Sequence, residues 1–413
     1  MAEKKGKGLN NPFIALKHRN FKIYWLGMCV SLIGTWMQNI AQPWLAYTLT
    51  QSPLLLSLVG IMQFLPMMIF SLFAGIIIDR YPAKKILLAT QSASLIVTLF
   101  LAVLVGTGQV RYWHILFAST ALGFINTFDM PTRQSFVIEL AGREDLLNAI
   151  ALNSSVFNIA RILGPALAGV IMSAVGTAWC FYINSFSFAA VIVSLLFIKP
   201  SAVQKIKKSG EKMGQSIMDG LRYILRDPLL LKTIIAVLIV ATFAMNFNVL
   251  VPVFSDVVLN QQESGFGFLM SFMGIGSFFG AMFVATRSKE GPHGFVLRFF
   301  PVFIAAALVF IGFTKTYFLA AIGLAASGFF FVSYSSTANS TLQLHTADEY
   351  RGRVMSVYTL VFGGSTPIGN LYAGLFAEHT GPSAGFIACG AVIVLLLGLV
   401  WAFRSKLRKN PQI

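Results

Sequence analysis

The charged residues most able to do chemistry in this chain lie inside apolar stretches. Asp129 and Arg133 are four residues apart in one such stretch, with Pro131 between them. Arg161 lies in the next stretch, where it shares a helix face with Asn158. A charge inside a bilayer is costly, so such groups face a bundle interior or a wet cavity and find partners there. A carboxylate that exchanges between guanidinium partners favours proton-linked chemistry. The alternative is an ion pair that only stabilises packing.

The elements that carry these residues are predicted to be membrane-spanning helices. Of the 413 residues, 56% are hydrophobic and 11% are charged, against roughly 25% charged in soluble domains. Apolar runs of about 20 residues recur along the chain between short polar breaks. Pro131 removes a backbone hydrogen bond and predicts a kink. We predict an all-α membrane protein with twelve spans, near residues 22–48, 54–78, 84–106, 112–138, 147–172, 176–198, 229–256, 264–287, 296–314, 317–342, 352–377 and 383–403.

The Lys and Arg residues predict the orientation of these spans. Apart from Arg111, Lys315 and Arg161, they fall in the tails, in the loops of one side or in the parts of the spans next to those loops. That side is the cytoplasm in membrane proteins, so both termini are predicted to be cytoplasmic. The net charge of +16 then reflects orientation and not nucleic-acid binding. The odd number of cysteines, Cys29, Cys180 and Cys389, all in apolar stretches, favours core residues over disulfides or a metal cluster.

The chain divides into two six-span halves. The predicted units are a basic tail (1–21), a first half (22–198), a cytoplasmic linker (199–228), a second half (229–403) and a cytoplasmic tail (404–413). Matching residues recur in the two halves: Asn39 and Pro43 with Asn248 and Pro252, Gly75 and Lys84 with Gly280 and Lys289, and Gly176 and Phe181 with Gly381 and Phe386, the last two sets at one constant spacing. Parallel repeats of this kind suit alternating access.

A short charged loop, GIIIDRYPAKK, follows the second span. We interpret it as a gating loop, in which the aspartate accepts from the N-terminus of a neighbouring helix near the start of span eleven. The basic residues would face anionic headgroups or acidic neighbours. Retention by positive charge alone explains the lysines but not an aspartate at the membrane edge. The predicted gating residues are Gly75, Asp79, Arg80, Lys84 and Lys85.

This loop resembles that of the major facilitator superfamily. Gly75, Asp79, Arg80 and Lys84 match the family pattern, although the second Gly and the following Arg of that pattern are Pro and Ala here. A second motif, ARILGPALAG in span five, resembles that of the superfamily's proton-coupled exporters. Its matching residues are Gly164, Pro165 and Gly169. Small residues four apart in this motif also predict a smooth stripe for helix packing, with or without a role in transport direction.

Longer segments resemble a bacterial exporter branch that includes the enterobactin exporter and multidrug and macrolide efflux pumps. They are FDMPTRQSFVIELAGREDLLNAIALNS, NIARILGPALAG and RGRVMSVYTLVFGGSTPIGNLYAG. The resemblance implies the major facilitator fold in the bacterial cytoplasmic membrane. It also implies proton-driven export of a small apolar or amphipathic molecule, such as a drug-like compound or siderophore, by a chain that acts as a monomer.

Polar residues inside the spans are candidates to line the substrate path. Polar groups without partners are costly in hydrocarbon, so they face a cavity or one another. Hydrogen bonding between helices is an equal alternative for each of them. The candidates are Gln38, Asn39, Gln42, Asn153, Asn158, Asn246, Asn248, Tyr334, Asn339 and Asn370.

Three functions are open to such a chain. The first is a proton-coupled exporter with Asp129, Arg133 and Arg161 in proton coupling. The second is an uptake symporter on the same fold, which would show an acidic pair in the cavity. The third is an intramembrane enzyme or scaffold, which would need convergent His, Cys or acidic residues at one depth. The sequence has no GxxxxGK[ST] loop or HExxH motif, so we predict no enzyme activity, cofactor or metal.

Overall fold

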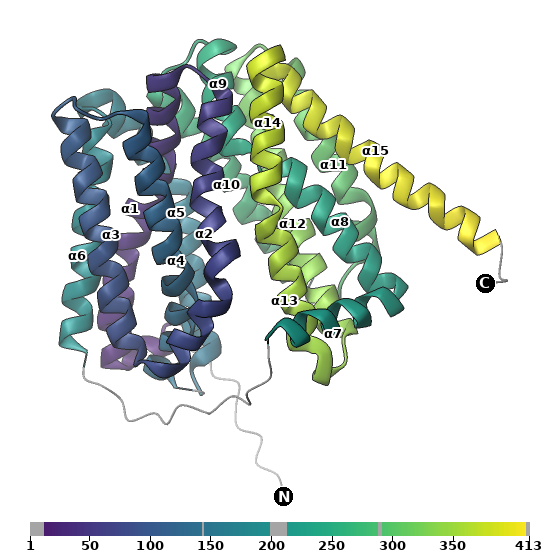
Figure 1. Ribbon diagram of the computed structural model, residues 1–413, viewed down its shortest axis with the longest axis horizontal. Coiled ribbons are helices and arrows are strands. Elements are labelled where there is room, and N and C mark those ends of the chain that lie inside the picture. Colours follow the sequence, from purple (N-terminus) through teal and green to yellow (C-terminus); the bar gives the residue numbers. More distant parts are fainter. Residues whose placement is uncertain (1–11, 143, 199–212, 288–290, 410–413) are drawn as a thin grey trace, which may run out of the picture.

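The computed structural model describes residues 12–142, 144–198, 213–287 and 291–409, in which the chain forms two helical halves side by side (Figure 1). A short 3-10 helix, η1 (Ile14–Lys17), precedes the first half, which consists of α1 (Arg19–Thr50), α2 (Pro53–Arg80), α3 (Ala83–Gly106), α4 (Tyr112–Ala141), α5 (Leu146–Val175) and α6 (Ala178–Phe197). The second half consists of α7 (Met213–Arg226), α8 (Pro228–Ala244), α9 (Phe247–Val257), α10 (Glu263–Thr286), α11 (Gly294–Phe313), α12 (Tyr317–His345), α13 (Asp348–Gly364), α14 (Thr366–Thr380) and α15 (Pro382–Lys409). Helices α8 and α9 form one broken span, as do α13 and α14, which gives the twelve spans predicted.

Length and apolar composition alone identify nine of these spans within the described residues. The other three are α1, α4 and the broken pair of α13 and α14. Helices α1 and α4 carry buried polar side chains such as Gln38 and Asp129, which lower their hydropathy. A span that meets other helices on several sides tolerates such residues because its polar groups find protein partners there.

Local chemistry explains the two breaks. At the first, Asn246 donates its side-chain amide to the carbonyl oxygens of Thr242 (3.0 Å) and Phe243 (3.3 Å), and so caps the end of α8. At the second, Pro367 lies in the first turn of α14, and its missing N–H favours a helix start. Helix α4 continues through Pro131 to Ala141, so the proline does not end the helix, and the kink there stays a prediction.

The two halves meet along two seams, one between α5 and α10 and the other between α2 and α14. Close backbone approach at the first seam requires glycine, because a Cβ at Gly267 would lie 2.7 Å from the Cα of Gly169. At the second seam, a Cβ at Gly374 would lie 2.6 Å from the Cβ of Ser57.

We call the end of the molecule that holds η1, the start of α3 and the start of α13 the basic end, and we call the other end of the molecule the opposite end. The two glycine contacts lie toward the opposite end, because Gly169 and Gly374 are near the ends of α5 and α14, and Gly267 is near the start of α10.

Helix α7 packs on the second half at the basic end, against α13. The rings of Tyr223 and Tyr350 stack with centroids 4.5 Å apart, and Ile224 is fully buried. The second part of the predicted linker is therefore anchored on the second half. Residues 199–212 of that linker and parts of both predicted tails lie outside the described residues.

Candidate functional site

Asp129 on α4 is the centre of a buried polar cluster. Only 4% of its surface is exposed, and it is the one fully buried carboxylate in the described part of the chain. Its Oδ1 accepts from Thr90 Oγ1 (2.6 Å) and Gln91 Nε2 (2.8 Å) on α3. Its Oδ2 pairs with Arg133 one turn further along α4. Four-residue spacing on a helix brings this carboxylate and guanidinium together, as the sequence predicts.

Arg133 extends the cluster toward α1. Its Nη1 contacts the sulfur of Met28. Since the partners of the cluster come from α1, α3 and α4, it lies within the first half and not at a seam. Loss of the charge on Asp129 would leave Arg133 without a counter-charge in this cluster, which links the two groups energetically.

Arg161 lies in different surroundings, near the middle of α5 and at the seam with α10. A Cβ at Gly274 of α10 would lie 2.7 Å from its carbonyl oxygen. Its Nη2 donates to Asn158 Oδ1 (2.9 Å), and its guanidinium carbon lies 5.9 Å from the ring centroid of Phe157. The pairing of Arg161 with Asp129 expected in one state is not formed in this structure, in which Asp129 pairs with Arg133.

Gln38 and Gln42 belong to a second buried network inside the first half. Asn184 donates to Gln38 Oε1 (2.5 Å), and Thr98 donates to the same oxygen (3.3 Å). Gln38 in turn donates to Gln42 Oε1 (3.1 Å), and Gln42 donates to Ser119 Oγ (2.6 Å). These two glutamines thus make the hydrogen bonds between helices that were the alternative for each candidate, and their lining of a path stays a prediction.

Sequence reasoning missed the partners of both networks. Thr90, Gln91, Ser94 and Thr98 share one face of α3 and are all buried. Their spacing of three and four residues in an apolar span was the signal that could have identified them. The missed partners are Thr90, Gln91, Thr98, Ser119 and Asn184.

The other predicted path residues are dispersed. Tyr334 is 2% exposed, and its buried hydroxyl group makes no hydrogen bond, so it belongs to the interior of the second half. Asn370 is buried at the seam of α14 with α2, next to Gly60, and Asn246 is buried at the break between α8 and α9. Asn39, Asn153, Asn158 and Asn339 are half-buried and Asn248 is exposed.

The predicted exporter motif lies in the seam. Ala160 and Ala168 are fully buried, and a Cβ at Gly164 would lie 3.3 Å from the carbonyl oxygen of Ile33 on α1. On the side of α10, a Cβ at Gly267 would lie 2.5 Å from the carbonyl oxygen of Pro165. The small residues of this motif thus pack against α1 on one side of α5 and against α10 on the other. Gly169 of α5 also contacts α10, at Gly267.

The predicted gating loop is only partly as expected. Lys84 donates to the carbonyl oxygen of Ile198 (2.7 Å), so it caps the C-terminus of α6 and does not face an acidic neighbour. A Cβ at Gly75 would meet no atom within 4 Å. Arg80 is exposed and Lys85 lies in the first turn of α3, while the side chain of Asp79 lies outside the described set.

Two carboxylates of the second half contact the first half at the opposite end. Tyr47 on α1 donates to Asp256 Oδ2 on α9 (3.1 Å). Glu378 Oε2 on α14 accepts from Ser52 Oγ (2.8 Å) and from the backbone N–H of Leu54 (3.1 Å) at the start of α2. A carboxylate at a helix N-terminus is stabilised by the helix dipole. These contacts hold the two halves together at the opposite end.

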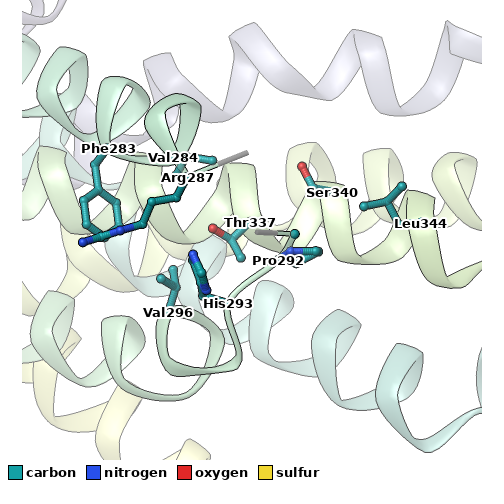
Figure 2. Close-up of a pocket in the computed structure, with 10 residues that line it drawn as sticks. Phe283, Val284, Arg287, Pro292, His293, Val296, Thr337, Ser340 and Leu344 are labelled. Atoms are coloured by element: carbon teal, nitrogen blue, oxygen red, sulfur yellow. The ribbon is translucent and has the colours of Figure 1, made fainter. Parts of the chain in front are cut away.

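Two cavities lie away from these clusters. The one in Figure 2 measures about 110 Å³ and lies between the basic ends of α10, α11 and α12, where Arg287 reaches across the ring of Phe283 at 4.2 Å. Ligand pockets usually measure roughly 300–1,000 Å³, so it is too small for a drug-sized molecule. The other, about 590 Å³, lies between α1 and α5 at the basic end, lined by Trp25, Cys29 and Leu152 among others.

Comparison with known proteins identifies the family. Residues 10–412 match the family model described as "Transmembrane secretion effector". The chain is a major facilitator superfamily transporter of this family. Its twelve spans, two halves and two seams are the fold in which such transporters work.

Similar curated proteins are efflux pumps and siderophore transporters. The transporter is 26% identical to the multidrug efflux pump Tap of Mycolicibacterium fortuitum, over 91% of this chain and 93% of that protein. It is 24% identical to the staphyloferrin A transporter of Staphylococcus aureus, over 94% and 97%. It is 23% identical to the enterobactin exporter EntS of Escherichia coli, over 98% and 97%.

Solved structures support the same fold. The nucleoside transporter NupG superposes with a TM-score of 0.74 at 14% identity, over 94% of this chain and 98% of that one. A bacterial homologue of the lysosomal transporter Spinster superposes with a TM-score of 0.72 at 12% identity, over 98% and 100%. Since identity is low, these matches concern the fold alone.

Proposed function

We propose that this transporter exports a small apolar or amphipathic molecule, a drug-like compound or siderophore, in exchange for protons. The observation that carries the proposal is Asp129, a buried carboxylate held by Thr90, Gln91 and Arg133. A proton on Asp129 removes its charge and so its attraction for Arg133. The same cluster thus has two arrangements, one with the ion pair and one without it, and a proton selects between them.

Alternating access supplies the movement that the proton drives. The Lys and Arg residues favour a cytoplasmic basic end, with both termini in the cytoplasm of a bacterial cell. In that orientation the contacts of Asp256 and Glu378 lie at the outer side, which supports an inward-facing form. Opening outward requires these contacts to break while α5 slides on α10 along the glycine-lined seam.

Inside-out vesicles with an acidic interior test the proposal. The neutral dye phenylnaphthylamine should accumulate in vesicles that contain the transporter, and a protonophore should abolish this accumulation. Vesicles with the same amount of Asp129→Asn should not accumulate the dye. Accumulation that persists with the protonophore would refute proton exchange. Dye movement only in the opposite direction would refute export and favour the uptake symporter.

A further inference from the structure

We propose that Arg161 and Asn158 bind an anionic group of the transported molecule, so that the substrates of this transporter include amphipathic anions. The inference names the substrate class of the proposed exporter and rests on that proposed function. It concerns a site distinct from the Asp129 cluster, because Arg161 lies at the seam between the halves and Asp129 lies inside the first half.

The charge balance around Arg161 is the first observation. Its Nη2 donates to Asn158 (2.9 Å), while its Nε is buried and has no hydrogen-bond partner. Among the residues that the structure describes, no carboxylate lies within ion-pair distance of this guanidinium group. The residue as a whole is half-buried, and a partly desolvated charge is stabilised by a counter-charge. The chemical group that this site lacks is an anion.

Acidic residues that the structure describes in the helices of the two halves have other partners or lie elsewhere. Asp129 already accepts from Thr90, Gln91 and Arg133. Asp256 and Glu378 accept from the first half at the opposite end. Glu263 lies in the first turn of α10, far along that helix from Gly274, which packs on Arg161. The missing anion is therefore supplied from outside the chain.

The position of Arg161 is the second observation. It lies where α5 of the first half crosses α10 of the second half. Carriers that alternate between two openings bind their substrate between the halves, near the middle of the membrane. An anion bound to Arg161 there would be exposed to one side or the other as α5 and α10 move.

The neighbours of Arg161 define the rest of the ligand. The ring of Phe157 lies 5.9 Å from the guanidinium carbon and is 42% exposed. Trp36 of α1 packs edge-on against Phe157, with centroids 5.6 Å apart. The planar fork of an arginine matches two oxygens of a carboxylate or sulfonate. The site thus suits an anionic group joined to an apolar or aromatic body.

A matched pair of dyes tests this inference. Anilinonaphthalene sulfonate and phenylnaphthylamine share one aromatic body, and only the first carries a sulfonate. Binding of each to the purified transporter in nanodiscs is followed by fluorescence, with empty nanodiscs as background. Arg161→Gln should weaken binding of the sulfonate by roughly tenfold to a hundredfold, because a charged hydrogen bond is lost. Binding of the neutral dye should change by less than about twofold.

Two further variants sharpen the comparison. Arg161→Lys should retain part of the affinity for the sulfonate, since the charge remains but the fork geometry is lost. Lys315→Gln removes a charge from an exposed loop at the opposite end and should leave both affinities unchanged. Its behaviour separates a local effect of Arg161 from a change in overall charge.

Two results would overturn the proposal. One is that the parent binds the two dyes equally well. The other is that Arg161→Gln weakens both dyes to the same extent, which would make Arg161 a packing residue or a partner of Asp129. These measurements are made at equilibrium without a proton gradient. A failure here leaves the vesicle test of proton exchange intact, and a failure of that test leaves the binding result standing.

Discussion

The two halves share one arrangement of helices but differ in what fills their interiors. At the spacing that relates Gly176 to Gly381, three buried polar residues of the first half have less polar counterparts in the second. Asp129 corresponds to Tyr334, Asn184 to Cys389 and Ser119 to Leu324, and all six are buried. The second half also has a group of packed aromatic rings between α10, α11 and α12, in which Phe300 is buried and Phe283, Phe329 and Phe330 are half-buried.

The difference indicates that the two halves have different roles in the conformational change. Buried hydrogen bonds can exchange partners, so a polar interior offers discrete alternative arrangements at similar free energy. Buried hydroxyl groups of the second half, such as those of Thr337 and Thr341, donate to carbonyl oxygens of their own helix, so they offer fewer alternative partners. We therefore expect proton-linked change in the first half, with the second half as the rigid partner against which it moves.

The largest effect should come from the pair Asp129 and Tyr334. Asp129→Asn should reduce proton-driven export by more than about tenfold, because the residue can no longer gain and lose a charge. Tyr334→Phe removes a hydroxyl group that makes no hydrogen bond and should leave export unchanged. Dye accumulation in inside-out vesicles at matched protein levels measures both. Equal losses in the two variants would contradict the division between the halves.

A smaller effect is expected from the network of Gln38. Asn184→Leu removes one of the two donors to Gln38 Oε1, the other being Thr98, and should lower stability by about 1–3 kcal/mol. The loss in the double change with Gln38→Leu should be smaller than the sum of the two single losses, because both single changes break the same hydrogen bond. Thermal unfolding in detergent measures this. A double variant less stable than the sum of the single changes would show that the amides do not act as a pair.

Contacts between the halves provide the next test. Glu378→Gln removes a negative charge from the start of α2, where the dipole effect contributes about 0.3–1 kcal/mol. The opposite end should open more often and the basic end should close more often. Crosslinking between cysteines placed at Asp79 and Gly352 reports closure of the basic end, and its yield should rise. An unchanged yield would mean that Glu378 does not hold the opposite end closed.

Much of this fold could be predicted from the sequence, because apolar length and the side preference of Lys and Arg act locally along the chain. The pairing of Asp129 with Arg133 followed from helical spacing in the same way. The burial of Ala160 and Ala168 followed from their size, since small residues permit close helix contact. These features need no knowledge of which helices become neighbours.

The features that were missed depend on those neighbours. Helical periodicity places Gln38 and Gln42 on one face, but it does not say whether that face meets another helix of the same half or the path between halves. Lys84 caps α6 through Ile198, a contact between segments far apart in sequence. The break at Asn246 depends on its side chain replacing backbone donors, which a hydropathy pattern does not reveal.

The smallest expected effect concerns an ion pair of the first half at the basic end. Asp145 lies next to the start of α5 and contacts Lys17 Nζ (2.9 Å) and His18 Nε2 (2.7 Å). These hydrogen bonds, that of Lys17 first, hold the pKa of Asp145 below its ordinary value of 3.8. A carboxylate with a lowered pKa stabilises the folded form above its unfolded pKa, and this contribution is lost as pH falls through the lower, folded value.

Attachment of η1 to α5 should therefore be constant at neutral pH and weaken only below about pH 4. Asp145→Asn should produce the same weakening at neutral pH, and limited proteolysis before α1 measures it as faster cleavage. The second half offers the matched control, since His345 approaches Asp227 at 3.4 Å at the same end. Asp227→Asn should leave cleavage before α1 unchanged. If both variants speed this cleavage alike, the effect is a general loosening of the basic end, and Asp145 has no specific role in holding η1.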